Sequence, residues 1–177
     1  NVNYIQGNYK FNKFISPGVE CEIAVFLDKD LPPENYPYNR ISVQEAVSDV
    51  MASIEIVDDR WVDYKSIDTL SLISDDFFAS GCVLGERIKL DKLKLSEISG
   101  RMLINDKLVG IGSGKDIMGH PLEALAWLAN FMSKRGKTLK ANQFVSLGSI
   151  VETKWVNLGD SVHIEIDGLG SAIANFI

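Results

Sequence analysis

Two acidic residues lie inside an otherwise apolar stretch of the chain, residues 17–27. Strand side chains alternate between faces, so Glu20 and Glu22 point to one face while the opposite face is wholly apolar. A third acidic residue, Glu55, lies between two isoleucines in a second strand-like stretch, residues 52–58. A carboxylate in apolar surroundings is costly unless it is paired, hydrogen-bonded, protonated or bound to a metal. The pattern therefore predicts two strands that carry three unusual carboxylates.

These three side chains are candidate ligands for a hard divalent cation. Mg²⁺ and Mn²⁺ are bound in proteins mainly through oxygen atoms, and Glu20, Glu22 and Glu55 offer only oxygens. The alternative is that the Glu-x-Glu pair forms the solvent face of an antiparallel sheet, which is where most carboxylates lie. Spacing alone leaves both interpretations open.

Bulk properties restrict the class of protein. A chain of 177 residues with 46% hydrophobic composition can bury one substantial core, so a single domain over residues 1–177 is expected. The net charge of -6 argues against a nucleic-acid partner, and no apolar run is long enough for a membrane helix. Cys21 and Cys82 form no CxxC motif, which predicts reduced thiols and a cytoplasmic location.

The periodicity predicts few helices and many short strands. A capping box at Ser42 predicts a short helix that ends near Met51, and a second helix is expected from Pro121 to the glycine at 136, with Trp127 in the core. Strands are expected at 143–147, 161–166 and 172–177. This alternation predicts a strand-rich α+β fold.

Residues 119–130, GHPLEALAWLAN, closely resemble the corresponding helix of the 2-keto-4-pentenoate hydratases and 4-oxalocrotonate decarboxylases, which belong to the fumarylacetoacetate hydrolase superfamily. The resemblance extends to VECEIA at 19–24, SIEIVDDR at 53–60 and VSLGS at 145–149. It covers nearly all of residues 17–177, in one consistent order.

The resemblance implies a mixed, highly curved β-sheet roll of the fumarylacetoacetate hydrolase C-terminal type, usually assembled into homo-oligomers. In it, Glu20, Glu22 and Glu55 match the three carboxylate ligands of Mg²⁺ or Mn²⁺. Ser149 matches a position near the substrate carboxylate, and Asp75 matches an aspartate of the family's Ala-Asp-Asn stretch. A purely structural role in a turn is the alternative for both. A local insertion ahead of Asp75 leaves the pocket wall and the substrate size open.

The function that the resemblance implies is that of a divalent-metal-dependent hydratase, a hydro-lyase of aromatic hydrocarbon catabolism. It would add water to 2-hydroxypenta-2,4-dienoate (2-keto-4-pentenoate) or a related small 2-oxo acid, giving a 4-hydroxy-2-oxo acid. The alternatives are a 4-oxalocrotonate-type decarboxylase and a non-catalytic metal-binding subunit. The family's N-terminal portion, which carries a catalytic lysine, is expected to be missing. Lys10 lies too close to Glu20 to be that lysine, so the catalytic residue stays unknown.

Overall fold

One mixed sheet carries most of the chain in a computed structural model, which describes residues 2–91 and 93–177. Within these residues eleven strands follow the order β8-β7-β10-β11-β2-β1-β5-β4-β3-β9, with β6 beside β4. The pairs β1–β5 and β11–β2 are parallel and the others antiparallel. The strands are β1 Val2–Tyr4, β2 Gln6–Tyr9, β3 Pro17–Leu27, β4 Val47–Asp58, β5 Ala79–Leu84, β6 Ile88–Lys89, β7 Ser99–Ile104, β8 Lys107–Ser113, β9 Phe144–Trp155, β10 Ser161–Ile166 and β11 Gly170–Phe176.

Helices are short and few, as the sequence predicts. The α-helices of the described residues are α1 Arg40–Gln44, α2 Thr69–Ser74 and α3 Pro121–Ser133. Single 3₁₀ turns occupy Phe11–Lys13, Pro33–Asn35, Tyr64–Ser66, Asp76–Phe78 and Gly114–Asp116. None of the helices in this part of the chain is long and apolar enough to cross a membrane. The predicted strand-rich fold with a mixed sheet is confirmed.

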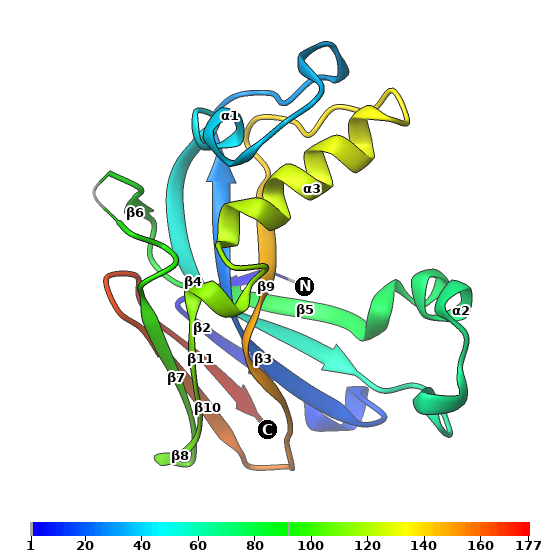
Figure 1. Cartoon of the computed structure of the whole chain (residues 1–177). Helices are drawn as coiled ribbons and strands as arrows, with labels where there is room; N and C mark the ends of the chain where they lie inside the picture. The colour runs from blue at the N-terminus through cyan, green and yellow to red at the C-terminus, as the bar shows by residue number, and fades with distance from the viewer. Residues whose placement is uncertain (1, 92) are drawn as a thin grey trace.

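The sheet curls into a roll whose two end strands, β8 and β9, meet (Figure 1). Two glycines of β8 allow this contact. A Cβ atom on Gly112 would lie 1.6 Å from the carbonyl oxygen of Ile150, and one on Gly110 would lie 2.2 Å from a methyl carbon of Val151. No side chain fits between the two backbones, so glycine is required there. The apolar face of β3 points into the roll and forms its core together with inward residues of the other strands.

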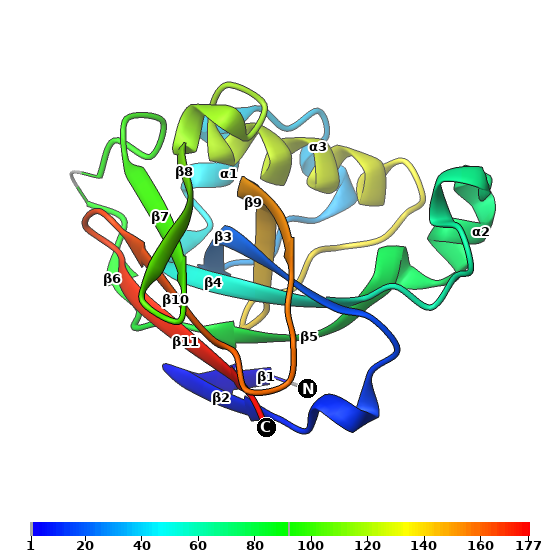
Figure 2. The same ribbon diagram turned by 90° about the horizontal axis from the view of Figure 1, so that it is seen from below.

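The helix α3 lies across the upper end of the roll beside α1 (Figures 1 and 2). It buries Leu122, Leu125 and Ala129 against the core. The Nδ1 atom of His120 caps the helix by accepting a hydrogen bond from the amide of Leu122 at 3.1 Å. The prediction that Trp127 is a core residue is wrong, because it lies on the outer face of the helix and is 58% exposed.

The helix predicted from Ser42 to Met51 is also wrong in its extent. The cap residue is Asn39, whose side chain accepts hydrogen bonds from two amides of the first turn, and the helix ends at Gln44. The chain then enters β4 at Val47, which pairs with Leu27 at the end of β3. β4 contains several β-branched residues, and such residues favour a strand over a helix. Tertiary strand pairing has overridden a local helical spacing.

Between β4 and β5 the chain leaves the roll as a projecting arm, residues 59–78, which contains α2 (Figures 1 and 2). None of the described residues 59–80 is buried. Hydrogen bonds to Asp75 hold the two ends of the arm together. Arg60 Nε donates to Asp75 Oδ1 at 2.9 Å, and Trp61 Nε1 donates to Asp75 Oδ2 at 3.2 Å. It therefore stands as an outer wall beside the strands that carry the three glutamates.

Candidate metal centre

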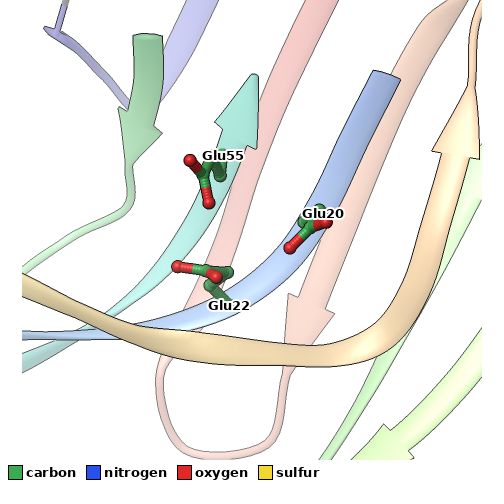
Figure 3. Close-up of side chains that lie close together, drawn as sticks. All are labelled: Glu20, Glu22 and Glu55. Atoms are coloured by element: carbon green, nitrogen blue, oxygen red, sulfur yellow. The ribbon is translucent and has the colours of Figure 1, made fainter. Parts of the chain in front are cut away.

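The pairing of β3 with β4 brings the three glutamates to one place. Glu20 lies directly opposite Glu55 in the antiparallel register, and Glu22 lies opposite Ser53. One carboxylate oxygen of each glutamate lies within 4.8 Å of the corresponding oxygens of the other two. Figure 3 shows the three carboxylates turned toward a common space from the two strands. The sequence pattern thus places the candidate ligands together through strand alternation and register alone.

This face of the sheet is not an ordinary solvent face. Glu22 is only 4% exposed, and Glu20 and Glu55 are partly buried. Further along the same face, Ala24, Met51 and Leu84 form a small buried apolar cluster of their own. The carboxylates therefore lie where desolvation is costly, which removes the solvent-face alternative.

The electrostatics of the cluster follow from this burial. Burial raises the pKa of Glu22 well above its usual value, and the charges of Glu55 and Glu20 raise it further. Burial raises the pKa of Glu55 from 4.5 to about 7, aided by the charges of Glu20 and Asp76. Three carboxylates at this spacing repel each other when ionised, so the cluster favours either protons or a cation between its members.

Hydroxyl groups from β9 orient two of the carboxylates. The Ser146 hydroxyl donates to the carboxylate of Glu22, and the Thr153 hydroxyl donates to that of Glu20. Such hydrogen bonds fix a ligating carboxylate in one orientation. The sequence did not single out Ser146 or Thr153, because the β3–β9 register shifts three times between Val19 and Ala24 and its pairing is not readable from spacing.

The donor set fits a hard divalent cation. None of the ion pairs among the described residues includes Glu20, Glu22 or Glu55, so no described basic side chain neutralises their charge. The hydroxyl of Ser53, fully buried opposite Glu22, has no hydrogen-bond partner in the structure. Buried polar groups rarely stay unpartnered, so an oxygen-coordinated ion with its shell of water suits this set of groups.

Neither of the two predicted substrate-binding residues forms a hydrogen bond with the three glutamates among the described contacts; both have other partners. The Ser149 hydroxyl donates to the carbonyl oxygens of Val151 at 2.6 Å and Cys21 at 3.2 Å, although Ser149 pairs with Glu22 in register. Asp75 is engaged by Arg60 and Trp61 within the arm, and the Arg60 side-chain hydrogen bond holds the pKa of Asp75 below its usual value. Their substrate-binding roles stay predictions.

A cleft of about 470 Å³ opens beside the carboxylates, and sequence reasoning did not identify its walls. Glu20 and Glu55 line it from β3 and β4, and other lining residues come from the arm and from β9. The remaining described lining residues are Val57, Tyr64, Phe77, Phe78, Glu152, Thr153 and Trp155. The cleft has the size of small-molecule sites and leads directly to the candidate metal ligands.

We expect Ser146→Ala to weaken binding of Mg²⁺ or Mn²⁺ by about tenfold, because the Glu22 carboxylate loses the hydrogen bond that orients it. Isothermal titration calorimetry of the metal-free protein measures this directly. The matched control is Ser161→Ala, which removes a hydroxyl bonded to the Asn175 side chain on strands away from the cluster. Equal metal affinity in the two variants would contradict the orienting role.

Comparison with known protein families gives one match that spans most of the chain. The family model described as "Fumarylacetoacetate (FAA) hydrolase C-terminal" matches residues 12–177. Among curated proteins, 4-oxalocrotonate decarboxylase of Pseudomonas putida is 31% identical over 94% of this chain. The 2-keto-4-pentenoate hydratase 1 of Dechloromonas aromatica (strain RCB) is 33% identical over 93% of this chain. The chain spans 62% of the length of each of these two relatives.

Solved structures give the same result. The 4-oxalocrotonate decarboxylase from Pseudomonas putida G7, complexed with magnesium and adipate, superposes with a TM-score of 0.93 at 28% identity. The superposition covers 99% of this chain and 66% of that one. The same enzyme complexed with calcium and acetate gives a TM-score of 0.91. Both similar structures therefore contain a divalent cation.

Proposed function

We propose that this chain, which belongs to the fumarylacetoacetate hydrolase family by its match to the C-terminal domain, acts as a divalent-metal-dependent hydratase of 2-oxo acid metabolism. The proposed substrate is 2-hydroxypenta-2,4-dienoate or a related small 2-oxo acid, and the product is a 4-hydroxy-2-oxo acid. The observation that carries the proposal is the convergence of three carboxylates that form no ion pair with a described basic side chain, two of which, Glu20 and Glu55, line a cleft. A relative named as such a hydratase supports the reaction class.

Glu20, Glu22 and Glu55 would hold the cation, which we propose to be Mg²⁺ or Mn²⁺. When bound, such a cation supplies Lewis-acid stabilisation of the negative charge that develops on the enolate oxygen of a 2-oxo acid. Ser146 and Thr153 keep two of the ligands in orientation. We assign no proton donor within this chain, so the proposal covers the electron sink and the binding of substrate.

Decarboxylation of a 4-oxalocrotonate-type acid is the second candidate. Glu20, Glu22 and Glu55 would hold the same cation, whose Lewis-acid chemistry would stabilise the negative charge left on the substrate by loss of CO₂. Relatives named as decarboxylases are about as similar to this chain as those named as hydratases, at 31% and 33% identity. A non-catalytic metal-binding subunit is the third, and only an assay separates the three.

The test follows the loss of dienol absorbance when 2-hydroxypenta-2,4-dienoate is mixed with the natural full-length protein. We expect turnover with Mg²⁺ or Mn²⁺ and loss of at least 99% of it after removal of the metal with EDTA, because the enolate charge is then unstabilised. A parallel assay with 4-oxalocrotonate measures CO₂ release. Metal binding without turnover of either substrate would exclude both enzymes and leave the metal-binding subunit.

We also propose that the protein acts in the cytoplasm as a homo-oligomer. Cys21 and Cys82 form no disulfide, which suits a reducing compartment. On the outer face of α3 the rings of Trp127 and Phe131 stack at 5.2 Å between centroids, although both are exposed. Exposed apolar groups of this kind are typical of subunit contacts. Analytical ultracentrifugation measures the oligomeric state directly.

A further inference from the structure

One part of the cleft lining is an aromatic wall. Tyr64, Phe77 and Phe78 come from the arm, and Trp155 comes from the end of β9. The rings of Tyr64 and Phe78 meet edge to face, with 5.7 Å between centroids and 82° between ring planes. Edge-to-face contact is a favourable arrangement for aromatic pairs, so the two rings support each other's position. An apolar ligand tail would have a surface to pack against there.

The backbone of the arm is bent specifically at this wall. Asp76, Phe77 and Phe78 have φ angles of 53°, 45° and 72°, which is the left-handed region. Three consecutive residues other than glycine in this region cost free energy, and such conformations gather at binding sites. The ion pair of Arg60 with Asp75 holds the chain just ahead of the bend. The bend brings Phe77 and Phe78 to the cleft, and Phe77 stays 51% exposed there.

The charges around the cleft are negative. Its acidic lining residues are Glu20, Glu55 and Glu152, and no Lys, Arg or His lines it within the described parts of the chain. Two nearby basic groups are already paired, since Arg60 Nε lies 2.9 Å from Asp75 and Lys154 Nζ lies 3.2 Å from Glu152. A second carboxylate at the far end of a bound acid would thus face aromatic rings and carboxylates. Placing an anion there without a partner is unfavourable.

The volume of the cleft also exceeds the need of a five-carbon acid. Pockets of about 470 Å³ are within the range that holds drug-sized molecules, which are considerably larger than a pentadienoate. The carboxylate cluster would bind the cation and, through it, the oxo-acid end of the substrate. The remaining space then lies along the aromatic wall of the arm.

On the basis of the proposed function, we propose that this site selects 2-oxo acids with a single carboxylate and an uncharged apolar tail that packs against Tyr64, Phe77 and Phe78. Dicarboxylic 2-oxo acids of the same length are disfavoured. The aromatic wall selects the tail of the substrate, whereas the carboxylate cluster binds only its oxo-acid end. It places specificity in the arm and leaves the metal centre unchanged.

Three stable 2-oxo acids test the proposal by calorimetric titration into the natural full-length protein saturated with Mg²⁺. They are pyruvate, which has no tail, 2-oxohexanoate, which has an apolar tail, and 2-oxoadipate, which ends the same tail in a second carboxylate. We expect 2-oxohexanoate to bind at least tenfold more tightly than either of the others, because its methylene groups leave water for an apolar surface. This readout requires no turnover.

The outcomes separate this proposal from the proposed function. If 2-oxoadipate binds as tightly as 2-oxohexanoate or more tightly, the proposed tail specificity is wrong and the metal-dependent binding of 2-oxo acids stands. If pyruvate equals 2-oxohexanoate, the aromatic wall does not bind the tail and the proposal is overturned as well. If none of the three binds in the presence of Mg²⁺, both proposals are wrong.

Two variants extend the test, because one of them should reverse the preference between 2-oxohexanoate and 2-oxoadipate. Phe77→Arg places a cation on the exposed aromatic wall, and we expect it to reverse the preference so that 2-oxoadipate binds more tightly than 2-oxohexanoate. The control is Leu70→Arg, which adds the same charge to the same arm at a residue 75% exposed on α2 and outside the cleft lining. Reversal in both variants, or in neither, would overturn the role of the wall.

Discussion

Replacement of Glu55 by glutamine is expected to weaken binding of Mg²⁺ or Mn²⁺ by more than about 100-fold, since one of three charged ligands is lost from the cluster. The rate with a dienol substrate should fall by about 1,000-fold or more, because the bound cation supplies several kcal/mol of charge stabilisation. Metal affinity is measured by calorimetry and the rate by loss of dienol absorbance.

The shape of the side chain is kept in Glu55→Gln, and the repulsion from Glu20 is removed. The metal-free variant should therefore melt no lower than the metal-free parent, which separates loss of metal from loss of fold. Glu152→Gln is the matched control, because Glu152 lines the same cleft but its side chain is 88% exposed. Glu55→Gln with a metal affinity within threefold of the parent would exclude Glu55 as a ligand.

The metal-free protein is expected to lose stability as the pH rises from about 4.5 to above 7. Burial, with the charges of Glu20 and Asp76, raises the pKa of Glu55 in the folded state from 4.5 to about 7. The folded state thus binds its proton more tightly than the unfolded state. The stabilisation from that proton is complete below pH 4.5 and is lost as the pH passes through 7. Glu22, whose pKa is also raised by burial, acts in the same direction.

The expected loss is on the order of 2 kcal/mol for Glu55, after allowance for its partial exposure to solvent. It corresponds to a fall in melting temperature of roughly 5 °C for a chain of this size. Saturating Mg²⁺ should remove the fall, since a cation replaces the proton between the carboxylates. Thermal melts with EDTA and with Mg²⁺ from pH 4.5 to 8 measure this effect. A melting temperature independent of pH in EDTA would contradict the raised pKa.

The core of the candidate site was predictable from the sequence. Strand alternation places Glu20 and Glu22 on one face whatever the register, and Glu55 joins them because the β3–β4 register sets it opposite Glu20. The elements with strong local signals were also predicted well. The strand 161–166 has the predicted bounds, and α3 begins at Pro121 as predicted.

The rest depended on contacts that no local pattern encodes. Ser146 and Thr153 reach the glutamates through irregular pairing of β3 with β9, where each shift in register changes which side chain faces which. Trp127 has helical spacing, but the core covers only one side of α3. The aromatic wall needed the left-handed bend at Phe77, and its sequence contains no glycine to signal one.

The two sides of the cleft differ in how they tolerate change. On one side, β9 lies between β3, to which it is hydrogen-bonded, and the glycines of β8, where even one added carbon meets the backbone of Ile150. On the other side, the arm has no buried residue among those described from 59 to 78. Substitutions in the arm therefore leave the sheet intact, while those beside β9 disturb it. Under the proposed function, we expect mutation of the arm alone to change the ligand preference around a carboxylate cluster that the fold keeps constant.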